Sequence, residues 1–464
     1  MRPEQRPLLI LIAAATLARL VLGWALPLGI DESYMVVAGR GSYALSYFDH
    51  PPLAWWMCRL AADLAGSEAA IVVRLPFIAL FALSTWLIAR LGTLVAGPRA
   101  GFWAAMAFNL APVFGITSGG WVLPDGPLDA ALLGAACCLI PALETSTWRC
   151  WVGVGLCFGL AMLAKYTAAL DGFGLVLFLL LTPGQRRWFA RPQLYVAGIV
   201  AALVFSPVIA WNLSNGFASL AFQSGRAAAA SLHPFGPVVV LAGEAAFLLP
   251  WIWAGLMLVL WRGLRQGAMR IRLLAWMAAP AIVLFCVVAL WSRQVLFHWA
   301  ASGYLMLFPL LGAWLAHKNW APRAAMASAA FLASLATIAL LLIWLPVPLP
   351  KDPQLQARNW TQLRAALPAG DLKLAAVSWA DAGKIGIGTG RDVVVLNADQ
   401  RQFHFRAHPA LGSDVVIIAP KRSLLQMQTQ FGPGFSSIQE INRVTISDTE
   451  FGVFLGHGVK SWPG

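Results

Sequence analysis

Long apolar runs constrain this chain more than any other feature. A helix that crosses a membrane needs about 20 mostly apolar residues. Only 11% of the residues are charged and 59% are hydrophobic, whereas a soluble domain carries roughly a quarter charged residues. We therefore expect a polytopic α-helical membrane protein of about 11 transmembrane helices. The expected spans are 8–28, 70–90, 101–118, 125–143, 151–167, 168–182, 194–213, 237–260, 273–291, 302–316 and 324–345.

The basic residues predict how these spans are oriented. Arg2 and Arg6 precede the first run, and every second loop after it is basic, which is typical of loops on the cytoplasmic side. The first run has no small-residue cleavage site, so we expect a retained helix rather than a signal peptide. Because the net charge of +13 lies largely in such loops, it does not indicate nucleic-acid binding. An odd number of spans places the C-terminal region outside.

The sequence changes character at about residue 350. Short apolar runs punctuated by Asp, Gly, Pro and Ser predict strands, and 354–370 predicts an amphipathic helix that ends at Gly370. We expect a transmembrane catalytic domain over 1–349 and a small α/β domain over 350–464, outside the membrane. The predicted strands are 374–379, 392–397, 414–420 and 450–456.

The first outer loop, 29–69, opens with the acidic pair Asp31–Glu32 directly after the first apolar run. Acids this close to a membrane segment are costly unless they face water or a partner. One alternative is a solvated loop. The other is a general base at the outer membrane face, where a carboxylate takes a proton from an acceptor hydroxyl as that oxygen attacks a sugar.

A second cluster in this loop is Tyr47-Phe48-Asp49-His50, followed by two prolines. The prolines predict the start of a helix along the membrane interface. Asp49 and His50 then lie beside a helix N-terminus, which attracts anions. The alternative is a capped interfacial helix with an incidental histidine. An adjacent His and Asp could also ligate a divalent metal, but no third ligand has helical spacing.

Two pairs of polar residues interrupt the apolar runs in the middle of the chain. Asp125 precedes a long apolar run and Asp129 follows one helical turn later, which indicates either a helix cap or a polar cavity. Lys165 and Tyr166 close the fifth run. The lysine either extends to the membrane surface or binds a lipid-linked phosphate as a point charge.

The remaining candidates are cations in expected outer loops, against the trend of the other basic residues. Arg226 and His233 lie in 214–236, and Arg293 and His298 in 292–301. An anionic ligand would explain them, and ordinary loop solvation is the alternative. Together the candidates place acids and bases in four loops at one membrane surface.

These motifs resemble the membrane glycosyltransferases of the GT-C fold, in particular the protein O-mannosyltransferase superfamily and the lipid A aminoarabinose transferase. The resemblance covers about the first 320 residues. It comprises the acidic pair, the aromatic-acid-x-PPLxxW run, the Pro-Asp at the start of the fourth span, Lys165-Tyr166 and the HWxxxxY of 298–304.

The resemblance implies a bacterial inner-membrane enzyme of the cell envelope that transfers a sugar from a polyprenyl phosphate, with inversion, to a periplasmic glycan, lipid or protein acceptor. It implies that Asp31 is the catalytic carboxylate and that interfacial helices at 34–45 and 53–65 surround the site. Asp49 and Asp125 match further acidic positions, and His50 stands where the lipid A enzyme has lysine. The expected substrate-binding residues are Glu32, Tyr47, Asp49, His50, Asp125, Lys165, Tyr166, Arg226, Arg293 and His298.

Two other functions are compatible with a membrane bundle. A transporter or flippase for a lipid-linked sugar would have charged residues at mid-membrane and inverted repeats, and the sequence shows neither. A partner-binding protein would work through the C-terminal region, which carries no phosphate loop and no nucleophile motif. The sequence favours the glycosyltransferase.

Overall fold

The computed structural model describes residues 5–226, 231–265, 267–345, 355 and 357–462. The chain forms two compact units. We call the first the membrane unit; it comprises Met1–Val21, Ala44–Ala54 and Arg74–Ser334. We call the second the sheet unit; it comprises Leu22–Tyr43, Trp55–Val73 and Leu335–Gly464. Two segments of the first outer loop thus belong to the same unit as the C-terminal chain.

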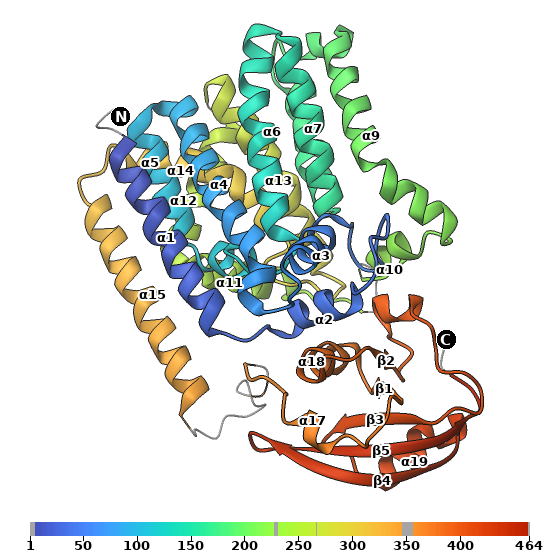
Figure 1. Cartoon of the computed structure of the whole chain (residues 1–464). Helices are drawn as coiled ribbons and strands as arrows, with labels where there is room; N and C mark the ends of the chain where they lie inside the picture. Colours follow the sequence, from blue (N-terminus) through green and yellow to red (C-terminus); the bar gives the residue numbers. More distant parts are fainter. Residues whose placement is uncertain (1–4, 227–230, 266, 346–354, 356, 463–464) are drawn as a thin grey trace. The chain divides into compact units, whose positions relative to one another are not determined.

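The membrane unit consists of helices, most of which are labelled in Figure 1. Three of them, α1, α4 and α15, extend past the limits of the unit, and a short π-helical turn η2 and a 3₁₀ turn η3 complete it. The helices are α1 (Arg6–Ala25), α4 (Ala70–Ala96), α5 (Pro98–Asn109), η2 (Phe114–Ser118), α6 (Asp125–Thr145), α7 (Trp148–Ala164), α8 (Ala168–Leu181), η3 (Arg186–Ala190), α9 (Pro192–Ser214), α10 (Ala218–Arg226), α11 (Gly236–Leu248), α12 (Pro250–Arg265), α13 (Met269–Val288), α14 (Ala301–Leu315) and α15 (Ala321–Trp344).

All eleven predicted runs fall on helices, but their lengths differ from the prediction. Among the described residues, six helices are long and apolar enough to cross a membrane: α1, α4, α6, α9, α13 and α15. A bend of 112° separates α11 from α12, and the pair would count as a seventh span. The break follows from Pro250, which cannot donate the backbone hydrogen bond that a continuous helix requires. The number of eleven spans is therefore not confirmed.

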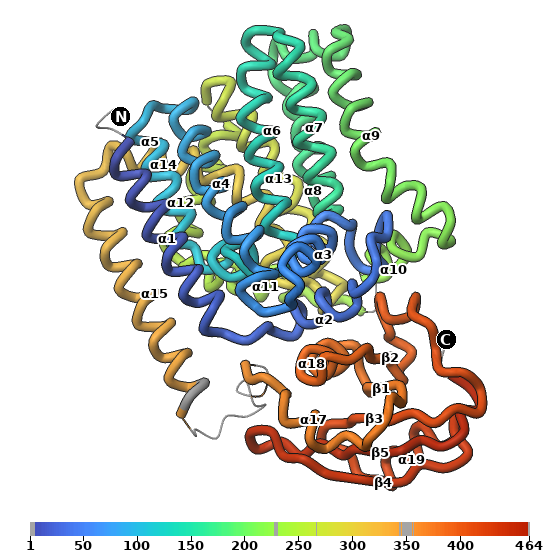
Figure 2. The backbone as a smooth tube through the Cα atoms, viewed as in Figure 1, coloured from blue at the N-terminus to red at the C-terminus, as the bar shows by residue number. Residues whose placement is uncertain are grey.

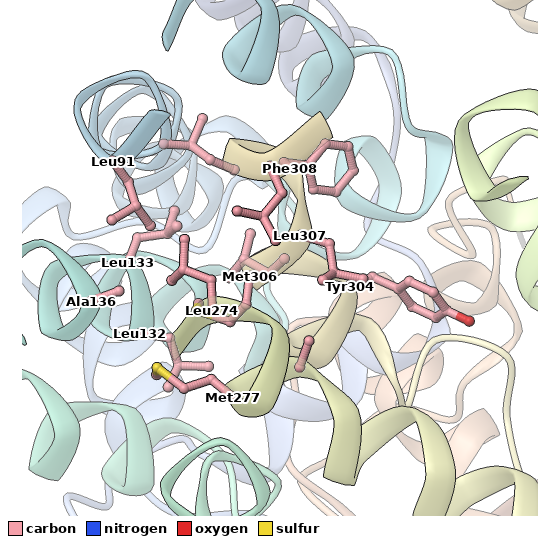
Figure 3. Close-up of a cluster of buried hydrophobic side chains, with 14 of the residues drawn as sticks. Leu91, Leu132, Leu133, Ala136, Leu274, Met277, Tyr304, Met306, Leu307 and Phe308 are labelled. Atoms are coloured by element: carbon pink, nitrogen blue, oxygen red, sulfur yellow. The ribbon is translucent and has the colours of Figure 1, made fainter. Parts of the chain in front are cut away.

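Aromatic rings and small residues fill the centre of the membrane unit. The rings of Phe81 and Phe108 stack with centroids 5.0 Å apart, and Phe308 of α14 meets Phe108 edge-on at 5.8 Å. Figure 3 shows the neighbouring cluster, where leucines of α6 gather with Leu274 and Met306. A Cβ on Gly312 would lie 2.3 Å from the carbonyl oxygen of Ala100, so only glycine permits α14 to approach α5 this closely.

Helices α6, α7 and α9 lie side by side, and α8 packs against α13 (Figure 2). The nearly continuous apolar stretch over 151–182 breaks at Lys165–Thr167, because α7 ends at Ala164 and α8 begins at Ala168. Lys165 itself has extended backbone angles, φ −156° and ψ 136°. The break leaves Lys165 outside both helices, with its side chain directed by tertiary contacts.

The sheet unit is built on five strands in the order β2-β1-β3-β5-β4. Strand β1 pairs in parallel with β2 and β3, whereas β5 pairs antiparallel with β3 and β4. The parallel crossover from β1 to β2 is made by α18. The elements of this unit are α2 (Ile30–Ala38), α3 (Leu53–Ala65), α17 (Leu363–Ala366), β1 (Lys373–Ala376), α18 (Trp379–Thr389), β2 (Val393–Val395), η4 (Arg401–Phe405), β3 (Val415–Pro420), α19 (Leu424–Phe431), η5 (Gly432–Gly434), β4 (Phe435–Ile446) and β5 (Thr449–Val459).

Helix α18 packs directly on α2. A Cβ on Gly383 would lie 2.6 Å from the backbone nitrogen of Tyr34, so the two helix backbones touch at this point. The ring of Tyr34 is buried against Trp379 at 5.1 Å, and its hydroxyl accepts a 3.0 Å hydrogen bond from the backbone N–H of Gln402. Segments more than 340 residues apart in sequence are thus joined in one core.

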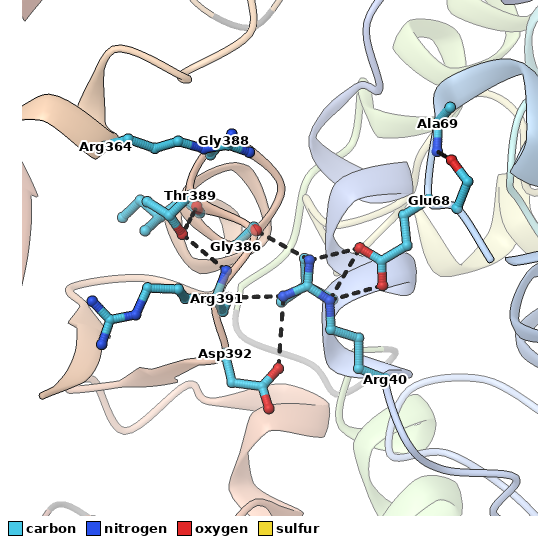
Figure 4. A network of polar contacts seen from close by, with 12 residues as sticks. Arg40, Glu68, Ala69, Arg364, Gly386, Gly388, Thr389, Arg391 and Asp392 are labelled. Carbon is cyan, nitrogen blue, oxygen red and sulfur yellow. Dashed lines mark hydrogen bonds and ion pairs between the residues drawn. The ribbon is translucent and has the colours of Figure 1, made fainter. Parts of the chain in front are cut away.

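A polar network around Arg40 completes this connection (Figure 4). The guanidinium donates from Nε and Nη2 to the carboxylate of Glu68, with a shortest distance of 2.6 Å. It also donates to the carbonyl oxygens of Arg391 at 2.7 Å and Gly386 at 3.1 Å. One arginine therefore links the end of α2, the end of α3 and the C-terminus of α18.

The four predicted strands correspond to β1, β2, β3 and β5, and β4 was not predicted. The predicted continuous helix over 354–370 is wrong for the described residues: Leu355 is helical, 357–362 are not, and α17 is a single turn. Trp360 explains the difference: it is buried against Phe451 and donates from Nε1 to the carbonyl of Leu355 at 3.0 Å. Of the two expected interfacial helices, 53–65 coincides with α3, whereas α2 ends at Ala38 and Gly39 caps it.

Candidate functional site

A buried ion pair marks the centre of the candidate site in the membrane unit. Nζ of Lys165 donates to Oδ1 of Asp125 at 2.9 Å, and the two side chains are only 10% and 7% exposed. Asp125 is the first residue of α6, where the helix dipole favours a negative charge. The break between α7 and α8 places Lys165 opposite this helix start. The pair satisfies two charges that would be costly to bury alone.

His298 lies beside this pair, in the loop before α14. The pKa of His298 is lowered to about 4, chiefly by burial and next by the positive charge of Lys165, while the carboxylate of Asp125 acts in the opposite direction. The positive charge of Arg226 also lowers the pKa of His298. The imidazole is consequently neutral at physiological pH and available as a hydrogen-bonding group among two cations and one anion.

Arg226, the last residue of α10, is held above an aromatic ring. Its guanidinium carbon lies 4.4 Å from the ring centroid of Trp299, within range of a cation–π interaction. Its backbone carbonyl accepts a 2.9 Å hydrogen bond from the hydroxyl of Ser292. The contacts tie the end of α10 to the loop that carries His298. They bring together two of the basic outer-loop residues that the sequence analysis selected, Arg226 and His298.

The segment around Asp49 is joined to α10 from the other side. The side-chain amide of Gln223 donates to the backbone carbonyl of Asp49, and the ring of Phe48 contacts Phe222 with centroids 4.9 Å apart. Tyr47 and Asp49 are buried. His50 lies close enough to Asp125 for its charge to act on that carboxylate. The second sequence cluster therefore belongs to the same neighbourhood as the ion pair.

Tyr166 and Arg293 have contacts of another kind. The hydroxyl of Tyr166 shares a 2.8 Å hydrogen bond with Ser219 of α10, which supports the position of α10. Arg293 is exposed and donates from Nε to Nε2 of His233 at 3.1 Å. The described contacts of Arg293 connect two loops and do not reach the ion pair.

Asp31 and Glu32 lie on α2 in the sheet unit. Glu32 is buried, and its Oε2 accepts a 2.8 Å hydrogen bond from the backbone N–H of Gly29. This is the reciprocal half of a helix cap, so Glu32 has a structural role that the sequence analysis did not assign to it. Asp31, one position earlier in the first turn, is exposed.

Sequence reasoning overlooked three polar residues of the membrane unit, Arg19, Ser118 and Glu244. The guanidinium of Arg19 lies 3.7 Å from the ring centroid of Phe81. Glu244 accepts a 2.7 Å hydrogen bond from the hydroxyl of Tyr304, which in turn accepts one from Trp253 at 3.0 Å. The hydroxyl of Ser118 donates to the buried Asp129. Charged residues inside apolar runs were the available signal for Arg19 and Glu244.

No group of three or more His, Cys, Asp and Glu side chains with the geometry of a metal site occurs within the described ranges. The sequence analysis considered a divalent metal only at Asp49 and His50, and that alternative stays untested.

The sequence is similar to known proteins that transfer sugars. Residues 49–211 match the dolichyl-phosphate-mannose-protein mannosyltransferase family. The chain is 25% identical over 283 residues to the lipid A galacturonosyltransferase RgtD of Rhizobium johnstonii, a match that covers 60% of this chain and 58% of that relative. It therefore spans less than two thirds of the length of this relative.

The whole chain also matches solved structures. It superposes on ArnT from Cupriavidus metallidurans in the apo state with a TM-score of 0.69 and 15% identity, covering 96% of this chain and 97% of that one. For the same protein bound to undecaprenyl phosphate the TM-score is 0.70 at 16% identity, covering 97% and 98%. At these identities the likeness shows the fold.

The chain is thus a multi-pass membrane protein with the GT-C fold. The resemblance on which the sequence analysis drew, to the mannosyltransferase and lipid A transferase group of GT-C proteins, is confirmed. The same matches support the expected enzyme class, a glycosyltransferase.

Proposed function

We propose that the protein is a glycosyltransferase that takes a sugar from a polyprenyl phosphate and transfers it to an acceptor at the periplasmic face of the bacterial inner membrane. Support comes from the fold, from the family match over residues 49–211 and from the buried ion pair Lys165–Asp125 with His298 and Arg226 around it. The last observation carries the proposal, because polar groups inside a membrane protein are expensive and mark substrate sites by default.

The proposed reaction is a single displacement at the anomeric carbon. The carboxylate of Asp31 accepts the proton of an acceptor hydroxyl as the hydroxyl oxygen attacks that carbon. The bond between the anomeric carbon and the phosphate oxygen breaks, and its electron pair leaves with the polyprenyl phosphate. Attack opposite the leaving group inverts the configuration. Asp31 is proposed for this role because it occupies an exposed position in the first turn of α2.

The phosphate is assigned to the cluster in the membrane unit. Lys165 and Arg226 carry two positive charges, Asp125 carries one negative charge, and His298 is neutral. The excess of one positive charge suits a phosphodiester donor, and it stabilises the second negative charge that develops on the phosphate as the sugar departs. Asp125 keeps Lys165 in position by a direct hydrogen bond. Asp49, His50 and Tyr47 are proposed to contact the sugar or the acceptor.

The acceptor is a glycan, lipid or protein, and lipid A is the first candidate because the similar protein of Rhizobium johnstonii is a lipid A galacturonosyltransferase. The periplasmic location of the site rests on the basic loops, which alternate with the loops that carry these residues.

The test compares cells with and without the gene by mass spectrometry of lipid A, other surface glycans and membrane lipids. Loss of a defined sugar mass from one acceptor, restored by the wild-type gene, is the expected result. Purified protein in lipid nanodiscs is then supplied with that sugar on undecaprenyl phosphate. Asp31→Asn should reduce transfer by about 10²-fold or more, the usual range for loss of a general base.

Asp448→Asn is the matched control, since Asp448 lies in the turn between β4 and β5 and should leave transfer unchanged. Near-wild-type transfer by Asp31→Asn would remove Asp31 from the mechanism. Movement of the lipid-linked sugar across the bilayer without any covalent product would favour a flippase instead.

A further inference from the structure

A second feature of the membrane unit lies between α5, α12, α14 and α15. These helices enclose a cavity of about 630 Å³, within the range of roughly 300–1,000 Å³ that ligand pockets occupy. Four tryptophans line it, Trp103, Trp251, Trp314 and Trp320. No lining residue among those described is charged.

One polar side chain of the pocket wall, Ser328, is paired within the protein. The hydroxyl of Ser328 accepts a 2.9 Å hydrogen bond from Nε1 of Trp251 and donates one of 2.8 Å to the carbonyl of Ala324. The hydroxyl is therefore already satisfied and has no need of a polar ligand. The remaining wall is alkyl and aromatic, which fits a hydrocarbon chain.

The end of the pocket at the turn between α14 and α15 is basic. Nζ of Lys318 lies 5.2 Å from the ring centroid of Trp314, which is itself a lining residue and contacts Trp320 edge-on at 5.5 Å. Arg323 follows in the first turn of α15 and Arg99 in the first turn of α5. The sequences of all four lining helices contain no Asp or Glu.

We propose that this pocket binds an anionic phospholipid, with an acyl chain between the four helices and the headgroup beside Lys318. The positive charge of Lys318 beside the lining residue Trp314 selects the class of lipid, since basic pockets between transmembrane helices attract anionic headgroups. Trp314 and Trp320, which lie at the same end, are of the residue type that is typical of the boundary between hydrocarbon and headgroups. The site is formed by elements other than the Lys165–Asp125 cluster, so it does not depend on the proposed function.

The test is native mass spectrometry of the full-length protein, delipidated in detergent and incubated with equal amounts of phosphatidylglycerol and phosphatidylcholine of the same chain length. Wild type should retain one phosphatidylglycerol. Lys318→Gln should reduce the preference for phosphatidylglycerol by about fivefold, as expected for one lysine at an anionic surface. Arg262→Gln is the matched control, because it removes a cation from the last turn of α12, beyond Leu258, the last lining residue of that helix.

A second pair of variants tests the cavity. Ala327→Phe fills the pocket from an exposed position on α15, whereas Ala329→Phe places the same ring on α15 outside the lining. Loss of the retained lipid in the first variant but not in the second is the expected result, with unchanged thermal melting showing that both fold.

Equal retention of the two lipids by wild type, or equal effects of Lys318→Gln and Arg262→Gln, would overturn the proposal. So would retention by Ala327→Phe. Displacement of phosphatidylglycerol by undecaprenyl phosphate would also overturn it, and would assign the pocket to a prenyl chain.

Discussion

Lys165 donates a 2.9 Å hydrogen bond to Asp125 across forty positions of sequence, and both side chains are buried. The lysine lies in the break between α7 and α8, and the aspartate is the first residue of α6. Because either charge alone would be unpaired in a poorly solvated environment, the two residues are coupled. Comparing single and double variants of this pair can therefore distinguish its contribution to stability from its contribution to sugar transfer.

Lys165→Met is expected to destabilise the protein by about 3–5 kcal/mol, since it leaves Asp125 buried without its partner. The double variant Lys165→Met with Asp125→Leu, which removes both charges, should recover much of that loss. Thermal unfolding in detergent measures both effects. Both variants should remain inactive in sugar transfer if the lysine contacts the donor phosphate. Recovery of transfer in the double variant would show that the pair serves stability alone.

His298 predicts a pH dependence of stability. Its pKa is about 4 in the folded protein and about 6.5 when solvated, so between these values the unfolded state binds a proton that the folded state does not. The contribution of His298 to the free energy of unfolding should therefore be constant above pH 6.5 and should fall as the pH decreases from 6.5 to 4. His298→Gln should reduce the decrease in melting temperature between pH 7 and pH 5, whereas His317→Gln, at an exposed position, should not. Equal decreases in all three proteins would contradict the assignment.

The elements that could be predicted are those that a local run of apolar residues marks in the sequence. Apolar runs are local, and each of the eleven falls on a helix. Helix α3 matches its prediction at both ends because two prolines precede it. Strand β4 was missed because it is an edge strand with mostly exposed residues such as Ser436, Gln439 and Asn442. Its polar sequence lacks the apolar run by which the other four strands were found.

The candidate site shows the same limit. Asp125, Lys165 and His298 were each chosen from local sequence, but nothing local indicates that the first two form an ion pair. That pairing depends on the break at Lys165 and on how α6 and α7 pack. Likewise, Glu32 was chosen for its charge, and its hydrogen bond to Gly29 became visible only in the helix cap. Charged residues near the membrane boundary indicated which residues belong to the candidate site. Their ion-pair and hydrogen-bond partners became known only from the fold.

Arg40→Lys should loosen the sheet unit although it conserves charge. A lysine cannot reproduce the two-pronged contact with Glu68 and also reach the carbonyls of Gly386 and Arg391. We expect a loss of about 1–3 kcal/mol for the unsatisfied groups, measured as faster hydrogen exchange in α18. Arg443→Lys is the control, because Arg443 is half-exposed and pairs with Glu440 and Glu450. Unchanged exchange in Arg40→Lys would show that water replaces the network.

Gly383→Ala tests whether the C-terminal chain holds the proposed catalytic carboxylate. The added Cβ would lie 2.6 Å from the backbone nitrogen of Tyr34, so α18 and α2 must separate. Since α2 carries Asp31, we expect faster hydrogen exchange in α2 and a loss of sugar transfer. Gly432→Ala is the matched control in the same unit, because a Cβ there meets no atom within 4 Å. Wild-type transfer by Gly383→Ala, despite a displaced α2, would show that the position of this helix is not required and would argue against Asp31 as the base.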